Sequence, residues 1–248
     1  MRIFFIIITL LYSINLHSKV INLQYEIDWK SVHLADLFWN ITINDSDYEI
    51  EFLIKSFGLT DKIYKYKSIT RVKGHIDGNY LRPFTYRSKT KSSNQDVYAN
   101  IDYSFDGLIK KIDIKKNLND EQLLMQDNLI NQFQYFTDPI SQLSQYLLYK
   151  SNSDRIIIDG LNIYELISND LIPINFDDKN SIIYQGNVDI LELSFPFFRG
   201  LHKLDKKNNL KEIKMYYANI DKYNIPIQFD ILSTKFKAKL YLKKYEIN

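Results

Sequence analysis

The sequence predicts a mainly β protein, built as a strongly curved antiparallel sheet or open β-barrel with one packed α-helix at about residues 139–149. Polar and apolar residues alternate with a period of two in most of the chain after residue 22, which is typical of strands with one buried and one wetted face. Aromatic residues make up 15% of the chain, mostly 19 Tyr and 15 Phe, and these residue types favour strands. A sheet this long must curl or split to bury its apolar face.

The alternation is clear in residues 48–55, where four apolar side chains share one face and Glu49, Glu51 and Lys55 lie on the other. Short polar turns between such segments indicate neighbouring strands joined as a meander. Residues 63–69 fit either a short helix or a strand. The segments with strand character are 23–29, 35–43, 48–55, 107–116, 155–158, 161–168, 181–194, 211–218, 225–232 and 235–247.

Residues 70–105 hold the most distinctive part of the chain, in which two segments of strand character flank a turn-rich, basic and aromatic middle. One interpretation is an edge strand and hairpin whose lysines deter aggregation between strands. The other is contact of Arg82 with an anion or lipid headgroup, because a guanidinium offers a rigid fork for phosphate. The lysine-rich face of residues 235–247 is interpreted in the same way, either as a solvated face or as protection of an edge strand.

The predicted helix begins after Asp138, whose side chain can accept hydrogen bonds from first-turn amides, and Pro139 suits the first helical position. Ile140, Leu143 and Leu147 follow at helical spacing, and we expect Leu143 and Leu147 to be core residues of this helix. Residues 117–127 read as a polar run without a helix, and residues 128–136 as either a lead-in helix or a loop over the sheet.

The first residues resemble a secretory signal peptide, with Arg2 before an apolar run at 3–12 and a cut near Ser18 and Lys19. The run is shorter than the roughly 20 residues needed to span a bilayer, so a retained anchor is the less favoured alternative. We therefore expect an exported periplasmic protein with a signal peptide at 1–18, a single β-rich domain at 19–248 and no transmembrane span in the mature chain.

Composition narrows the possible partners. Loss of the signal peptide removes Arg2 and leaves 31 of the 32 basic side chains against 30 acidic ones. This balance gives no global attraction to nucleic acid or to an anionic membrane, so we expect no nucleic-acid partner. The chain has no Cys, which excludes disulfides, thiolate metal sites and lipid attachment through an N-terminal cysteine.

No motif indicates catalysis, a metal or a cofactor. Outside the signal peptide, His33, His75 and His202 are isolated, whereas zinc needs three or four suitable ligands. Acidic pairs at 45/47, 120/121 and 177/178 lie in polar sequence where Asp commonly caps turns. The chain lacks a G-x-S-x-G elbow, an S-x-x-K motif with its partners and a phosphate-binding Gly loop. We therefore predict that the protein is not an enzyme.

Several short motifs occur in an order that resembles a known family. After the signal peptide come SFGL at 56–59, LRPFTY at 81–86, Asp-Pro-Ile-Ser at 138–141, and an IDG segment that leads into a Tyr-containing strand at 158–164. This order resembles the exported bacterial proteins of the domain of unknown function 3108 family, over roughly residues 20–245. The resemblance implies a mainly β envelope protein of Gram-negative bacteria and no catalytic residue. Such members often carry a Cys after the helix, which this chain lacks.

A curled sheet with a helical lid can enclose an apolar cavity, which favours a periplasmic carrier of an apolar or amphipathic ligand, such as a lipid or lipoprotein. The candidate ligand-binding residues are Phe52, Ile54 and Ile101 on the concave side, with Arg82 and Tyr86 near the rim. The alternative is that the apolar and aromatic side chains fill a solid core and Arg82 only braces a turn. A structural or assembly factor that binds another envelope protein through a sheet edge is the second function class, and an envelope hydrolase is the third.

Overall fold

The computed structural model describes residues 18–248 except 94–95, 115–117, 152–154, 179–182 and 203–209. The described chain forms one 14-stranded sheet whose paired strands are antiparallel, which confirms the predicted fold class. The sheet is open, because β11 and β7 lie at its two ends, and β8 pairs with β9 beside the main path. Its order is β11-β9-β10-β12-β13-β14-β1-β2-β3-β4-β5-β6-β7.

The N-terminal half supplies a nearly continuous meander from β1 to β7. Its strands are β1 (Lys19–Trp29), β2 (Val32–Ile43), β3 (Asp47–Ser56), β4 (Tyr66–Asp77), β5 (Tyr80–Ser92), β6 (Asp96–Tyr103) and β7 (Ile109–Ile114). The C-terminal half contains β8 (Arg155–Ile158), β9 (Asn162–Phe176), β10 (Gly186–Ser194), β11 (Phe198–Gly200), β12 (Leu210–Ile220), β13 (Tyr223–Ser233) and β14 (Lys237–Ile247).

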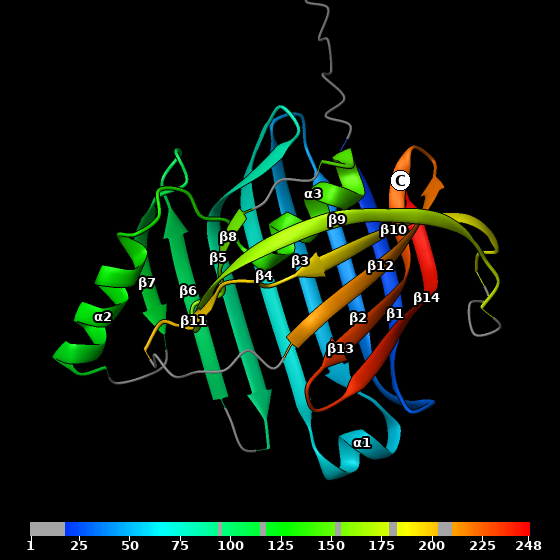
Figure 1. The fold of residues 1–248 in the computed structure, drawn as a ribbon, viewed down its shortest axis with the longest axis horizontal. Helices are drawn as coiled ribbons and strands as arrows, with labels where there is room; N and C mark the ends of the chain where they lie inside the picture. Colours follow the sequence, from blue (N-terminus) through cyan, green and yellow to red (C-terminus); the bar gives the residue numbers. More distant parts are fainter. Residues whose placement is uncertain (1–17, 94–95, 115–117, 152–154, 179–182, 203–209) are drawn as a thin grey trace, which may run out of the picture.

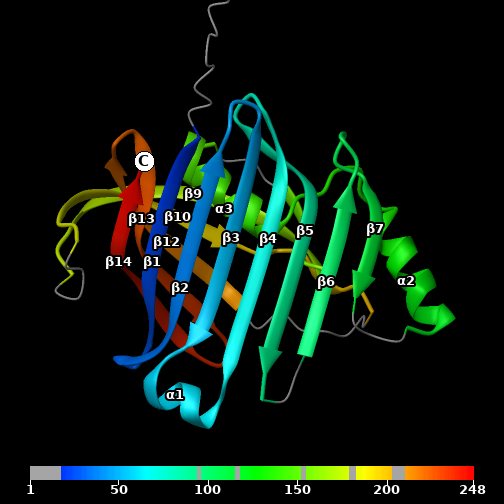
Figure 2. The same cartoon turned by 180° about the vertical axis from the view of Figure 1, so that it is seen from behind.

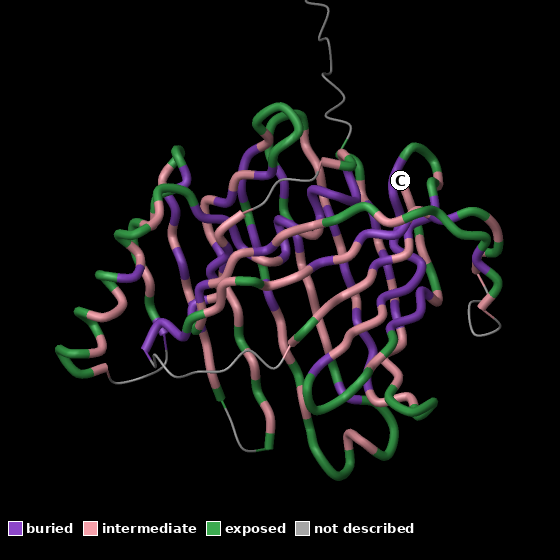
Figure 3. Tube along the Cα trace, viewed as in Figure 1, coloured by how far each residue is buried: buried purple, intermediate pink, exposed green. Residues whose placement is uncertain are grey.

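The sheet curves so that its C-terminal strands lie across the inner face of its N-terminal strands (Figure 1; Figure 2 shows the outer face). Helix α3 (Pro139–Tyr149) lies between the two halves, where it contacts β13 on one side and β3 and β5 on the other. The buried residues follow the strands and this helix, whereas the turns at both ends of the sheet are exposed (Figure 3).

Helix α3 has the predicted bounds. The Asp138 side chain accepts hydrogen bonds from the backbone amides of Ile140 and Ser141, both at 2.9 Å, and Pro139 occupies the first turn. The helix ends at Tyr149, and the next residue, Lys150, adopts the left-handed conformation with φ of 51°. The capping chemistry expected from the sequence therefore defines where this helix begins.

Two further helices were missing from the sequence interpretation. Helix α1 (Gly58–Ile63) connects β3 to β4, and α2 (Asp120–Ile130) occupies most of the supposedly polar run at 117–127. Asn119 and Gln122 form a capping box at the start of α2. The assignment of the 120/121 acidic pair to a turn was wrong, because both acids lie in the first turn of this helix.

The central segment 70–105 contains an interior strand, and the edge interpretation was wrong. Its middle is β5, which pairs with β4 on one side and β6 on the other. Pro83 is accommodated there by a register shift next to Gly74, since proline cannot donate to the strand ladder and is confined in sheets to edges and bulges. A side chain at position 74 would meet the backbone of Arg82 and the ring of Tyr48.

The lysine-rich C-terminal segment is also interior, because β14 pairs with both β13 and β1. Edge protection therefore does not explain its charges. Lys243 instead forms an ion pair of 2.9 Å with Glu26 on β1.

The strand bounds otherwise follow the alternation with shifts at their ends. The largest difference is β9, which continues to Phe176, well past the expected end at residue 168. Residues 179–182 and the predicted signal peptide, apart from Ser18, lie outside the described part, so the prediction at 1–18 is not tested. Strand β1 begins at Lys19, directly after the predicted cut. No helix among the described residues combines the length and apolar character that crossing a membrane requires.

Candidate functional site: a lysine groove beside helix α1

Four of the five candidate ligand-binding residues lie on the inner face of β3, β5 and β6. Ile101 is fully buried and lies directly opposite Tyr86, which is also in the core. Phe52 and Ile54 are half-buried and pack against the core, with the Phe52 ring meeting Trp39 edge-on at 5.7 Å. The structure thus brings these four residues together as parts of one packed layer.

Arg82 lies apart from that layer, in the first part of β5 at the end of the sheet opposite α1 (Figure 1). Its Nε donates a hydrogen bond to the Asp77 carboxylate at 2.7 Å across the β4–β5 turn. Arg82 also lines a small cavity of about 20 Å³ together with Arg155, Gln142 and Gln145. A cavity of this volume has room for about one water molecule.

Helix α3 occupies the space in which the sequence placed an apolar pocket. Trp39 donates a hydrogen bond to Ser144 at 3.2 Å, and the hydroxyls of Tyr48 and Ser141 lie 2.7 Å apart. On the other side of the helix, a cavity of only about 10 Å³ remains between Leu143, Tyr146 and strands β9, β10 and β12. Ligand pockets are typically about 300–1,000 Å³, so both cavities are too small for a lipid.

The N-terminus of α3 carries a buried carboxyl group. Burial raises the pKa of Asp138 from 3.8 to about 6, although its hydrogen bonds with Ser141 and Ile140 oppose the shift. Its Oδ2 atom and the buried hydroxyl of Tyr103 have no hydrogen-bond partner among the described residues. Because its Oδ1 atom accepts both first-turn amides, Asp138 acts as the helix cap, and its titration should affect stability.

The three histidines among the described residues lie on separate parts of the fold. His33 Nε2 lies 3.1 Å from Asp36, His202 Nε2 lies 2.8 Å from Gln126, and His75 is stacked between Phe84 and Phe105. Within the described residues, no three His, Asp or Glu side chains form a cluster suited to a metal ion. These contacts give each histidine a local structural role.

A larger hollow lies beside α1, at the end of the sheet where β3 leads into β4. Its volume is about 580 Å³, which is within the usual range for ligand sites. We call it the lysine groove. Its lining consists of Lys55, Ser56, Asp61, Lys65, Tyr66, Lys67, Lys91, Ser92 and Ser93.

The register of three neighbouring strands brings three of these lysines into one row. Lys55 on β3 lies directly opposite Lys67 on β4, and Lys67 lies directly opposite Lys91 on β5. Directly opposite residues in an antiparallel pair have Cβ atoms about 5 Å apart, and like charges in such positions are destabilising. The row therefore concentrates positive charge at the wall of the groove.

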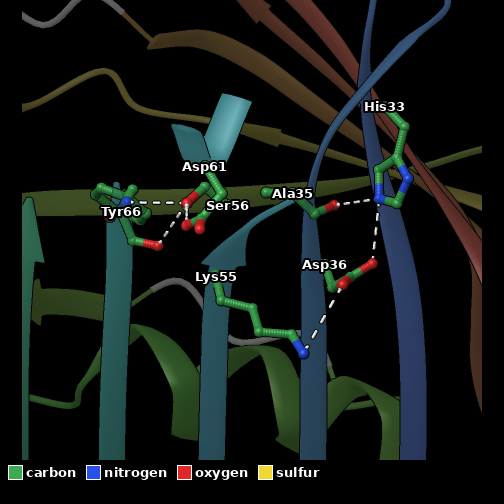
Figure 4. Close-up of polar contacts among 7 residues, drawn as sticks. All are labelled: His33, Ala35, Asp36, Lys55, Ser56, Asp61 and Tyr66. Carbon is green, nitrogen blue, oxygen red and sulfur yellow. Dashed lines mark hydrogen bonds and ion pairs between the residues drawn. The ribbon is translucent and has the colours of Figure 1, made fainter. Parts of the chain in front are cut away.

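Hydrogen bonds at the groove fix its single acidic residue (Figure 4). Ser56 Oγ donates to the Asp61 carboxylate at 2.6 Å and accepts from the Tyr66 amide at 3.0 Å. Lys55 lies 4.0 Å from Asp36, which also contacts His33. Among the ion pairs between described residues, none includes Lys65, Lys67 or Lys91.

A second open groove of about 460 Å³ lies farther along β4, β5 and β6, and includes Arg71, Arg87 and Lys89 in its lining. Its two arginines are paired, Arg71 with Glu51 and Arg87 with Asp102. Its charge is therefore largely compensated within the protein, unlike that of the lysine groove.

Sequence reasoning did not identify the lysine groove. The alternation indicated that Lys55 lies on the polar face of its strand, but Lys65, Lys67 and Lys91 come from other segments. These lysines come together only through the register of β3, β4 and β5. That register depends on the lengths of the β3–β4 and β4–β5 connections. The repeated lysines near the ends of predicted strands were the available signal.

Comparisons with known proteins do not assign the chain to a family. No family model matches it, so the similarity to the domain of unknown function 3108 family stays a prediction. No curated protein matches it either. Among solved structures, it is similar to a β-barrel-like protein of domain of unknown function DUF1849 from Brucella abortus, with a TM-score of 0.42, 9% sequence identity, and coverage of 93% of this chain and 98% of that chain. A likeness at this level assigns neither family nor activity.

Proposed function

We propose that the protein is an exported envelope protein that binds an anionic amphipathic lipid, with the lipid headgroup held in the lysine groove. The observation that carries this proposal is the row of Lys55, Lys67 and Lys91 across three paired strands. The ligand class is the one that the sequence favoured, and the site is a different one.

The charge of the groove supports an anionic ligand. Its lining contains four lysines and one acidic residue, Asp61, which already accepts a hydrogen bond from Ser56. A phosphate-bearing headgroup would reduce the repulsion between Lys67 and its neighbours, and charge-assisted hydrogen bonds from ammonium groups to phosphate are among the stronger ones. Binding of an anion should therefore be favourable and should weaken as salt increases.

The apolar part of such a ligand has a surface to contact within the groove. Tyr66 contributes its ring to the lining, and the aliphatic stems of the lining lysines add further apolar surface. A phospholipid combines an anionic headgroup with acyl chains, so it satisfies both features.

The inner face is less suited to this role in the described structure. Tyr86 and Ile101 are buried, and α3 covers the layer to which they belong. A ligand between Phe52, Ile54 and these residues would have to displace the helix and its hydrogen bonds with Trp39 and Tyr48. Binding at the groove requires no such rearrangement.

Export to the periplasm is part of the proposal and is supported by the sequence alone, through Arg2 and the apolar run at 3–12. The absence of nucleophile motifs supports a binding role over hydrolysis. An envelope hydrolase, the third function class, is therefore less favoured, because no candidate catalytic residue supports it.

Binding of a protein partner through a sheet edge is less favoured. The end strand β7 carries Lys110 and Lys111. The second part of β9 pairs only with β10 and is therefore also an edge, and it carries Pro173 beside the exposed Ile172. Lysine and proline on such strands discourage the addition of another strand.

Calorimetric titration with a short-chain phosphatidylglycerol below its micellar concentration tests the proposal. We expect saturable binding that weakens by about tenfold or more in Lys67→Thr, since loss of one charged contact of about 1.4 kcal/mol has that effect. Lys110→Thr, on β7, is the matched control and should bind like the unmodified protein. No saturable binding, or equal affinity for short-chain phosphatidylcholine, would contradict the proposed function.

A further inference from the structure

Helix α1 presents apolar side chains to solvent without packing any of them. None of its six residues is buried, and Leu59 and Ile63 are 75% and 84% exposed. A connection between two strands needs no large apolar residues for its turn chemistry. Exposed apolar side chains that gather at one place commonly mark an interaction surface.

Other turns expose apolar side chains at the same end of the sheet. Trp29 and Val32 flank the β1–β2 turn, and Phe236 lies in the β13–β14 turn. The antiparallel pairing of β14, β1, β2 and β3 places these turns beside α1, as Figures 1 and 2 both show. The exposed apolar residues therefore come from three separate connections and share one end of the molecule.

Lysines are interleaved with these apolar residues in every one of the three connections. In the β1–β2 turn, Lys30 follows Trp29, and its Nζ atom lies 4.8 Å from the centroid of the Trp29 ring. In the α1 connection, Lys62 and Lys65 flank Ile63 and Tyr64. In the β13–β14 turn, Lys235 and Lys237 flank Phe236. All five lysines are exposed. We call this set of connections, with their apolar residues and lysines, the basic–apolar end.

The opposite end of the sheet has a different character. Its β2–β3 connection contains Asp45 and leads into Asp47, its β4–β5 turn begins after Asp77, and its β6–β7 turn contains Asp106. These connections thus carry aspartates at one end of the sheet and lysines at the other, although the mature chain is nearly neutral overall.

We propose that the basic–apolar end docks the protein on the surface of an anionic lipid bilayer. Side chains such as Leu59, Ile63 and Phe236 would enter the boundary between headgroups and acyl chains, while the lysines contact anionic headgroups. This combination of basic and apolar side chains is typical of proteins that lie on anionic membranes.

The charge of the surface favours a bilayer over a second copy of this chain. Two copies joined through this end would bring Lys62 and Lys65 of each near the lysines of the other, and like-charge contacts oppose association. An anionic bilayer complements both the lysines and the apolar side chains. The inference goes beyond the proposed function, because it depends on Leu59, Ile63 and Phe236 and not on the row of lysines inside the groove.

Docking would also orient the lysine groove. The groove shares Asp61 and Lys65 with the α1 connection, so it would open close to the headgroups of the bilayer. A lipid could then move between bilayer and groove without crossing water.

Cosedimentation of the mature protein with phosphatidylglycerol or phosphatidylcholine vesicles tests the inference. We expect binding to phosphatidylglycerol vesicles that weakens with salt, and little binding to phosphatidylcholine. The double variant Leu59→Ser/Ile63→Ser should bind about tenfold more weakly or worse, because two partly inserted side chains are lost. Circular dichroism and thermal melting establish that the variant is folded, as expected for residues that are exposed.

Ile172→Ser is the matched control, because Ile172 is 85% exposed on β9, which crosses the molecule away from α1 (Figure 1). It should leave vesicle binding unchanged. Absence of binding by the unmodified protein, or an equal loss in Ile172→Ser, would overturn docking through this end. A dimer in solution that the double variant loses, without any vesicle binding, would identify the end as an interface between copies instead.

The vesicle and short-chain lipid experiments can fail separately. Vesicle binding that survives Lys67→Thr while short-chain lipid does not bind would remove the proposed function and support docking. The reverse result would support the proposed function and remove docking. In that case short-chain lipid binds, but the protein binds both vesicle types equally and the Leu59→Ser/Ile63→Ser variant binds vesicles as well as the unmodified protein does.

Discussion

Lys67 of β4 lies directly opposite Lys91 of β5 in an antiparallel strand pair. Lys55 of β3 lies directly opposite Lys67 on the other side. Facing like charges reduce the stability of a sheet. Lys91 also lies opposite Asp96 of β6, but no ion pair between described residues includes Lys67 or Lys91. A role in binding an anion explains why a sheet would retain this arrangement.

Replacing Lys67 by Thr should therefore affect stability and binding in opposite directions. Thr favours strands and removes the central charge of the row, so the free energy of unfolding should rise by about 0.2–1 kcal/mol. Urea unfolding at low salt measures the change. A fall in stability would show that the facing lysines are not under repulsion, whatever the effect on lipid affinity.

Gly74→Ala should destabilise the protein by about 1–3 kcal/mol, as is typical of an added atom in a packed region. A Cβ atom at this position would lie 2.7 Å from the Tyr48 ring and would also meet the backbone carbonyl of Arg82, which cannot rotate away. Displacement of Tyr48 would also disturb its contact with Ser141 of α3. A melting temperature equal to that of the unmodified protein would contradict this explanation of the bulge.

Leu147→Ala should reduce stability by about 2–5 kcal/mol, because Leu147 is fully buried between α3 and the sheet. Leu143→Ala should cost clearly less, since Leu143 is only half-buried beside a small cavity. The sequence placed both leucines in the core, and the structure distinguishes them. Denaturant unfolding of the two variants provides the comparison, and equal losses would contradict it.

Asp138 should make stability depend on pH between about 4 and 6. The pKa of its carboxyl is about 6 in the folded protein against 3.8 without burial. The folded state therefore binds more protons than the unfolded state in this range, so stability falls as pH rises and then stays constant. A shift of roughly two pH units corresponds to about 3 kcal/mol.

Asp138→Asn isolates this effect, because Asn is an equally good helix cap and does not titrate. The variant should match the unmodified protein near pH 4 and exceed its stability by up to about 3 kcal/mol at pH 7.5. The difference in unfolding free energy between the two proteins, measured across this range, removes the contribution of all other groups. A difference that is constant with pH would show that Asp138 is not the titrating group.

N-terminal sequencing of the protein recovered from the periplasm tests export. We expect the mature chain to begin near Lys19, where β1 starts. Recovery of a chain with intact Met1 from the cytoplasm would contradict the proposed location.

Most of the fold could be predicted because its signals are local. Alternation within segments such as 48–55 identified strands, and Asp138 with Pro139 identified the start of α3. Helix α2 was missed because Leu123 and Leu124 are exposed and only Leu129 is buried, so the helix has little apolar face to detect.

The site was harder to predict because it depends on relationships between segments. The inward direction of Phe52 and Ile54 follows from alternation, but the position of α3 over this layer does not. Pro83 suggested a turn or an edge, and only the bulge opposite Gly74 explains its place in an interior strand. The row of lysines in turn depends on the register of β3, β4 and β5.

Photo-crosslinking with a short-chain phosphatidylglycerol that carries a photoreactive group near its headgroup tests the central claim most directly, because it locates the ligand. Mass spectrometry of the digested protein should find the label within residues 55–67 and 91–93, and excess unlabelled lipid should remove it. Labelling confined to peptides that contain Ile101 or α3, or labelling that does not compete, would contradict binding at the lysine groove.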